Sequence, residues 1–476
     1  MLTSWLGADG NRRETIRRVA EDTMRLSLHV ISKAGFGQEL PWPNQDAQDG
    51  AFSDDTAPRG HSMSFAFALH FILQHTLLLI ILPRWLLKNA PFSKWRRTYE
   101  AYDEWGRYMR EMLADKRQEM ELDTSKTYND VISQLVEAQV QGKKDKSVSA
   151  LTDNQVLGNS FVFILAGHET SANTIHFSMM FLALRPDIQR KLQEELDEIF
   201  QGRPISEWNY DRDLPRLFGG MVGAVMNEEL RVIQPVIAIP KWVPPQSPQR
   251  LIVEEKEVTV PAGAIFELCT AAVHRNPKYW PHGSPQDPTT PYFPPSNPDN
   301  DLEEWKPERW LQPSPSSNHN DPNITLSSTP STIPPTPTPT STFTSTPSTD
   351  PLNISTTPST SPHLFTPSRG SYIPFSDGHR SCLGRRFAQV EILVALAVIF
   401  SQYSIELAVD DTTDEEIDLM TPEDKKRVWK AAEKETNRIW MTKLKSRITL
   451  QIRGEERIGF RVRRRGEEKF FFPVSS

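Results

Sequence analysis

The chain has 476 residues, of which 37% are hydrophobic and 24% are charged, and its net charge is −7. This composition allows a substantial core, and the acidic balance excludes a general nucleic-acid binder, because phosphate binding needs a basic face. The two cysteines, Cys269 and Cys382, are too few for a disulfide scaffold or for a zinc site built from several thiolates.

Near the N-terminus, residues 1–18 lack the apolar run of a secretory signal peptide. The uncharged segment Met63–Leu82 is long enough to span a bilayer. His70, Gln74 and His75 lie in its middle, where polar groups are costly. A pair of helices that is buried or touches a membrane surface, ended by Pro83, is therefore favoured over a membrane span.

Hydrophobic periodicity predicts helices over most of the remaining chain. Pro186 stands where a helix tolerates proline, at its first position. The expected helices are Trp105–Met120, Val156–Leu184 through the core, one opening at Pro186, Met221–Val232 and Leu383–Tyr403. Short strands are expected in Leu251–Phe266 and a β-hairpin in Arg447–Phe472, where the basic run Arg461–Arg465 predicts a solvated strand edge. The fold class is mainly α with small β-sheets.

One stretch predicts no packed structure. Ser, Thr and Pro make up 33 of the 42 residues in Ser327–Ser368, too polar a composition to bury a core. We expect a single domain over residues 1–476 with a disordered Ser/Thr/Pro-rich insertion at about 312–369, and a smaller surface insertion over Pro281–Pro298. Glycosylation sequons begin at Asn323 and Asn353, which matter only in a lumenal chain.

The pattern F-x-x-G-x-R-x-C-x-G runs from Phe375 to Gly384. Cys382 precedes a predicted helix, whose free amides favour a thiolate, and a thiolate is the ligand that promotes O–O cleavage on an iron porphyrin. Gly378 permits a tight turn, and Arg380 can bind a haem propionate. Phe375 would cover the sulfur, while Gly384 permits close approach of the helix to the porphyrin. A buried structural cysteine is the alternative.

With this pattern, the chain resembles the cytochrome P-450 family of haem-thiolate monooxygenases. The resemblance implies heme b with Cys382 as its axial ligand. It extends to residues 166–171, A-G-H-E-T-S, which match the family's oxygen-activation segment. There the resemblance assigns Ala166 and Gly167 to the haem side, with space for dioxygen at Gly167. Thr170, by bonding back to its helix, can loosen one turn, and Glu169 and Thr170 then relay protons.

Two further segments match in order. Glu228 and Arg231 form the family's E-x-x-R and share one helix face, so they can pair. Pro307–Trp310 resembles the family's P-E-R-F/W segment, and by resemblance Arg309 joins Glu228 and Arg231 in a buried structural network. His168 lies at a position that the family leaves variable, so it receives no role.

The resemblance implies a monooxygenase that inserts one oxygen atom from O2 into an apolar small molecule. An NADPH-dependent reductase would supply electrons at the cytoplasmic face of the endoplasmic reticulum membrane. The sequence style resembles fungal members, many of which act in secondary metabolism. The family's usual N-terminal anchor, first sheet and W-x-x-x-R propionate ligand are not recognised, which predicts an N-terminally incomplete fold.

Two alternatives remain. The chain could be a truncated, haem-poor remnant without monooxygenase activity, as the unrecognised N-terminal part suggests. It could instead be a secreted, mucin-like interaction protein, as the Ser/Thr/Pro run and the sequons suggest. Haem content separates the monooxygenase from both alternatives, and glycosylation would identify the secreted, mucin-like protein.

Overall fold

The computed structural model describes residues 1–7, 14–37, 39–40, 42, 57, 60–122, 130–144, 150–253, 255–284, 299–311, 364–409, 412–446, 449–454, 456–470 and no others. Within them, helices predominate and strands occur only in small antiparallel pairs, so the predicted class is confirmed. The predicted insertion over 312–363, with Asn323 and Asn353, lies outside the described residues, as does most of Pro281–Pro298.

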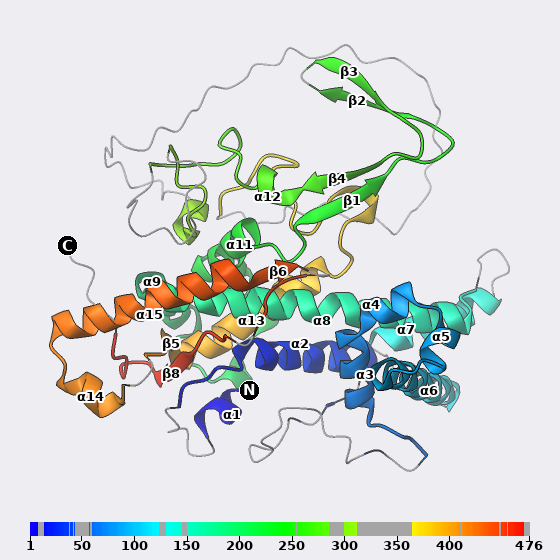
Figure 1. Ribbon diagram of the computed structural model, residues 1–476, viewed down its shortest axis with the longest axis horizontal. Helices are drawn as coiled ribbons and strands as arrows, with labels where there is room; N and C mark the ends of the chain where they lie inside the picture. Colours follow the sequence, from blue (N-terminus) through cyan, green and yellow to red (C-terminus); the bar gives the residue numbers. More distant parts are fainter. Residues whose placement is uncertain are drawn as a thin grey trace.

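The first part of the chain is helical, and its helices α3 to α7 gather at one end of the molecule, at the right in Figure 1, whereas α1 and α2 do not. Their bounds are α1 Leu2–Leu6, α2 Val19–Phe36, α3 Phe65–Gln74, α4 Thr76–Ile81, α5 Arg84–Lys88, α6 Ser93–Leu122 and α7 Val131–Lys144. Met63–Leu82 is thus a helix pair broken at His75, as expected. No helix in the described part of the chain is long and apolar enough to cross a bilayer.

The longest helix, α8 (Asp153–Leu184), crosses the centre of the molecule with α2 along one side (Figure 1). A capping box between Thr152 and Gln155 fixes its start, and α9 (Pro186–Phe200) begins directly after it, at the proline. The remaining helices are α10 Tyr210–Gly219, α11 Met221–Val232, α12 Thr270–Val273, α13 Arg385–Gln402, α14 Asp414–Leu419 and α15 Pro422–Lys443.

In the described residues the core forms two large buried apolar clusters that α8 joins, and a small third cluster of Val409, Ile417 and Phe470. The C-terminal half of α8 packs with α9, α11 and α13, and every residue of α11 is buried. The N-terminal half of α8 packs with α2, α6 and α7. Helix α11 carries the E-x-x-R segment, and α13 begins three residues after Cys382, so the larger cluster positions both sequence motifs.

Four antiparallel strand pairs complete the described fold. They are β1 (Ala238–Trp242) with β4 (Ile265–Cys269), β2 (Gln249–Val253) with β3 (Lys256–Val260), β5 (Tyr403–Leu407) with β8 (Phe460–Arg464), and β6 (Leu444–Ser446) with β7 (Leu450–Ile452). The β2–β3 hairpin extends away from the helices (Figure 1).

Two expectations for the C-terminal region were wrong. The strands of Arg447–Phe472 do not pair with each other, because β8 pairs with β5, whose residues come more than fifty positions earlier. The basic run is not a solvated edge either, because Arg461 and Arg463 are buried and form ion pairs with Asp414. In β8 the four successive residues 460–463 are buried, and only Arg464 is exposed.

The predicted insertion begins and ends beside buried structure. Leu311 and Leu364 form an isolated antiparallel bridge, and the Phe365 N–H donates to the Trp310 carbonyl at 2.7 Å. Leu364 is fully buried, so residues 364–369 of the predicted insertion belong to the ordered part of the fold. The single-domain assignment itself stays a prediction.

Candidate functional site

The loop that carries Cys382 has a defined backbone. The Cys382 N–H donates to the Phe375 carbonyl at 2.8 Å, which closes the loop on itself. Gly378 has φ +77°, a left-handed conformation that favours glycine, and it opens the short 3-10 helix η4 (Gly378–Arg380). Helix α13 then begins at Arg385, so the cysteine lies three residues before the start of a partly buried helix.

The pKa of the Cys382 thiol corrects one expectation. We expected the start of the helix to lower it, but partial desolvation by the neighbouring protein raises the pKa above its ordinary value, although the residue as a whole is exposed. The Gly384 amide and Arg385 oppose that effect without overcoming it. The helix start therefore does not by itself produce a thiolate, whereas a metal ion deprotonates a coordinating thiol outright.

The surroundings of Cys382 fit a flat, apolar, anionic group such as haem. Cys382 is exposed, and Leu383 beside it is 84% exposed, an unusual position for a large apolar side chain beside a buried helix. A Cβ added at Gly378 or Gly384 would meet no atom within 4 Å. Arg380 is exposed and forms no ion pair with any described residue, so its guanidinium is available for a propionate.

The predicted oxygen-activation segment lies on α8, and α8 packs against α13. Ala166 is exposed, and Thr170 donates its hydroxyl to the Ala166 carbonyl at 2.8 Å. This back-bond was expected, but the loosened turn is absent, because α8 stays a regular α-helix here. A Cβ at Gly167 would come within 3.2 Å of Ile31 on α2, so this glycine permits the close contact of the two helices.

Glu169 has a partner that the sequence analysis missed. The side chain of Gln451, on β7, donates to the Glu169 carboxylate and also to the Thr449 hydroxyl. Thr449 in turn accepts from Asn173, one turn after Glu169 on α8, at 3.1 Å. A polar chain therefore joins α8 to β7, and no sequence pattern links residues that lie more than 270 positions apart.

The structure brings Glu228, Arg231 and Arg309 together in a buried network. Arg231 donates to Glu228 with Nε and Nη2, at 2.8 and 2.9 Å, and both side chains are fully buried. Arg309, on the 3-10 helix η3 (Pro307–Trp310), donates to the same carboxylate at 2.9 Å and pairs with Asp301. Carboxylate–guanidinium pairs with this geometry combine charge and directional hydrogen bonds.

Two more donors to Glu228 were not foreseen. The Trp310 indole N–H donates to Oε2 at 2.8 Å, and the Lys306 backbone N–H donates to Oε1 at 2.9 Å. Burial would raise the pKa of Glu228, but Arg231 and Arg309 lower it to about 2. Glu228 is therefore a fixed negative charge that holds η3 against α11.

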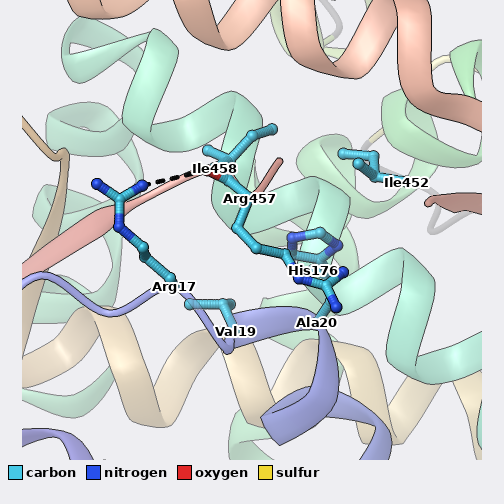
Figure 2. Close-up of a pocket in the computed structure, with 7 residues that line it drawn as sticks. All are labelled: Arg17, Val19, Ala20, His176, Ile452, Arg457 and Ile458. Atoms are coloured by element: carbon cyan, nitrogen blue, oxygen red, sulfur yellow. Dashed lines mark hydrogen bonds between the residues drawn. The ribbon is translucent and has the colours of Figure 1, made fainter. Parts of the chain in front are cut away.

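Other candidate groups lie apart from these motifs. His168, which the resemblance left without a role, is buried, and its Nδ1 contacts the Ile164 carbonyl on its own helix at 3.1 Å. Figure 2 shows a small pocket at the start of α2, lined by Arg17, Val19, Ala20, His176, Ile452, Arg457 and Ile458. Arg457 is already paired with Glu21 at 2.7 Å, and no predicted site residue lines this pocket.

The family model described as cytochrome P450 matches residues 61–289 and 361–429, more than half of the chain. The chain belongs to the cytochrome P450 family. The match omits residues 290–360, which hold most of the Ser/Thr/Pro run. Members of this family hold haem through a cysteine thiolate and, in general, use electrons from a reductase, O2 and organic substrates.

Among the most similar curated relatives are fungal cytochrome P450 monooxygenases. One from Arthrobotrys oligospora is 28% identical over 426 residues, covering 86% of this chain and 63% of the relative. One from Postia placenta is 26% identical and covers 84% and 60%, and one from Penicillium rubens is 27% identical and covers 86% and 61%. The chain thus spans about three fifths of the length of these relatives.

Solved structures support the fold. The cytochrome P450DA heme domain aligns with 96% of this chain and 70% of its own, at a TM-score of 0.56 and 18% identity. At this identity the likeness concerns the fold alone.

Proposed function

We propose that this chain forms the haem-binding and oxygen-activating part of a monooxygenase that inserts one oxygen atom from O2 into an apolar small molecule. The observation that carries the proposal is the exposed Cys382, whose backbone N–H donates to the Phe375 carbonyl and which lies three residues before α13. That helix packs against α8, which carries the exposed Ala166 and the Thr170 hydroxyl.

Heme b, when bound, would supply the iron at which dioxygen is activated. Cys382 would ligate the iron as a thiolate, and Arg380 would bind a propionate. Gly384 leaves the space in which the porphyrin can approach α13, and Phe375 packs on the buried core beneath the loop. Gly378 holds the turn that places Arg380 and Cys382 on the same short segment.

Glu169 and Thr170 would handle protons on α8. The Thr170 hydroxyl hydrogen is engaged with the Ala166 carbonyl, so its oxygen remains free to accept a proton or a hydrogen bond from water. The Glu169 carboxylate is oriented by Gln451 and is half-buried, so it would exchange protons between solvent and the region beside the Thr170 hydroxyl. Both groups lie one turn or less from Ala166 and Gly167.

The apolar surface of α4 and α5 supports a membrane-associated location. Ile80, Ile81 and Trp85 are each about 70% exposed on neighbouring turns. Exposed apolar side chains grouped in this way are typical of surfaces that contact lipid or protein. We propose the cytoplasmic face of the endoplasmic reticulum membrane, with an NADPH-dependent reductase as electron donor. The similarity to fungal monooxygenases supports a role in secondary metabolism.

The decisive measurement is the reduced carbon monoxide difference spectrum of the expressed chain and two matched variants. Cys382→Ala should lose the red-shifted Soret band of thiolate-ligated haem, whereas Cys269→Ala, which removes the other exposed cysteine, should keep it. A Cys382→Ala protein with the native spectrum would refute the ligand assignment. Soluble protein with no haem signal in any variant would favour the haem-poor remnant.

Proton handling has its own test. Thr170→Ala should keep the haem spectrum but release more peroxide per NADPH oxidised, because proton delivery beside Ala166 fails. Thr170→Ser keeps a hydroxyl and should restore coupling. Equal peroxide release from both variants and the unchanged chain would exclude the relay.

A further inference from the structure

His274 connects the buried ion-pair network to the cysteine loop through two different hydrogen bonds. It follows α12 directly and is fully buried. Its backbone carbonyl accepts from Arg231 Nη1 at 3.1 Å, and its imidazole Nε2 accepts from the backbone N–H of Ile373 at 2.9 Å. One residue therefore holds the network arginine with its main chain and the loop with its side chain.

The bond to Ile373 reaches the segment that supports the ligand loop. Ile373 lies two residues before Phe375, whose carbonyl accepts from the Cys382 N–H. The neighbouring Tyr372 donates its hydroxyl to the Asn227 carbonyl on α11 at 3.2 Å. The segment that leads into the loop, residues 371–374, is thus fixed from two sides. Among the described residues, His274 supplies the one side-chain acceptor for a backbone N–H of this segment.

The imidazole keeps its acceptor role over the working pH range of the protein. Burial lowers the pKa of His274 to about 3, and the nearby Arg231 charge contributes in the same direction. The ring is therefore neutral, and because Nε2 accepts from Ile373, its hydrogen sits on Nδ1. A protonated ring would carry hydrogens on both nitrogens and could not accept the Ile373 N–H.

We propose that His274 is a positioning residue that transmits the geometry of the Glu228–Arg231–Arg309 network to the loop bearing Cys382. The inference deepens the proposed function, since the loop is the one that would ligate haem. The hydrogen bond by which His274 orders the Ile373 backbone does not require haem to be bound. The experiment therefore first measures amide hydrogen exchange of the backbone and then the spectrum of the bound haem.

Amide hydrogen exchange of the expressed chain provides the first readout. His274→Leu should speed exchange at the Ile373 amide about tenfold or more relative to amides of α9, because the buried N–H loses its acceptor. His274→Gln offers a carbonyl oxygen in place of Nε2 and should recover much of the protection. His176→Leu is the matched control, because it removes a buried imidazole that lies on α8 and lines the pocket in Figure 2.

The outcomes separate the inference from the proposed function. Selective exchange at Ile373 in His274→Leu, with protection in His274→Gln and His176→Leu, supports the positioning role even if no haem is bound. In haem-loaded protein, the same variant should also lower the fraction of the thiolate-ligated spectrum. Equal exchange in His274→Leu and His176→Leu would overturn the inference, and so would equal exchange in His274→Leu and His274→Gln.

A measurement on the unsubstituted chain covers the case in which His274→Leu does not fold. Nitrogen NMR of histidine-labelled protein, as the diamagnetic reduced carbon monoxide complex or without haem, should show one neutral ring protonated at Nδ1. That ring should not titrate down to about pH 4, because its pKa is about 3. Its assignment to His274 follows from loss of the signal in His274→Gln, and a ring protonated at Nε2 would overturn the inference.

Discussion

Replacing Glu228 with glutamine tests whether the buried network stabilises the fold. The carboxylate accepts two hydrogen bonds from Arg231 and one each from Lys306, Arg309 and Trp310. Glutamine has nearly the same shape, so no cavity forms. However, its NH2 group would face donors, and the two buried guanidinium groups would lose their shared negative charge.

The magnitude follows from the pKa of Glu228. Lowering a carboxyl pKa from 4.5 to about 2 corresponds to about 3 kcal/mol of preference for the charged form. Breaking one partner of a buried ion pair costs about 3–5 kcal/mol in general. We therefore expect Glu228→Gln to lower the free energy of unfolding at pH 7 by about 3 kcal/mol.

The chain supplies a matched control with the same spacing. Glu435 and Arg438 on α15 also stand at i and i+3 and pair through two hydrogen bonds, at 2.8 and 2.6 Å. Both are about half exposed, so Glu435→Gln should change stability by less than about 1 kcal/mol. The two variants are compared by urea unfolding monitored by circular dichroism, with the same dependence of the free energy of unfolding on urea concentration for both.

The lowered pKa of Glu228 also determines how its contribution to stability changes with pH. Because the pKa of Glu228 is lowered in the folded state, its stabilisation is present above about pH 4.5 and is lost as the pH falls towards 2. The difference between Glu228→Gln and the unchanged chain should therefore shrink below pH 4.5. A Glu228→Gln protein no less stable than Glu435→Gln at pH 7 would refute the reasoning.

Two further predictions concern buried groups near the same helices. A Cβ at Gly220 would lie 2.2 Å from the Glu195 carboxylate that accepts the first N–H of α11. In a thermal unfolding assay, Gly220→Ala should therefore destabilise the fold by about 1–3 kcal/mol. Gly158→Ala, at an open position on α8, should be neutral or slightly stabilising in the same assay. Burial raises the pKa of Glu391 on α13 to about 7. Because this pKa is raised on folding, the stability of the unchanged chain falls as the pH rises from about 4.5, where the unfolded carboxyl ionises, to about 7, where the folded one does. Glu391→Gln should therefore gain stability relative to the unchanged chain over this range, and a constant difference would contradict this.

Local patterns predicted those elements whose structure depends on nearby residues. The buried C-terminal part of α8, residues 171–184, lies in the segment predicted to pass through the core, α9 begins at the proline as predicted, and α11 has the predicted bounds. Helix α15 was not predicted, since only a few of its 22 residues are buried and its apolar stripe is therefore weak. The pairing of β5 with β8 depends on tertiary contacts between distant segments, which a local pattern does not contain.

In the candidate site, too, some features could be predicted from local sequence and others depend on distant segments. The loop from Phe375 to Gly384 and the segment on α8 could be found from residue order and resemblance. The acceptor and donor partners could not, because Gln451 for Glu169 and His274 for Ile373 come from other elements far along the chain. Likewise, the buried Arg461 and Arg463 look solvated in sequence, because their partner Asp414 is supplied by another segment.

Two of the E-x-x-R sequences in this chain show what the fold adds to a motif. Glu228–Arg231 and Glu435–Arg438 have equal spacing and nearly equal hydrogen-bond lengths. They differ in burial and in what surrounds them, because Arg309 and Trp310 close on Glu228 while the α15 pair remains about half exposed. In water the exposed pair contributes little, whereas the buried carboxylate must keep all its donors to offset the loss of hydration. The stabilising role therefore belongs to the whole set of donors around Glu228, including those of η3, together with the His274 carbonyl that accepts from Arg231. The sequence motif marks only the centre of this network.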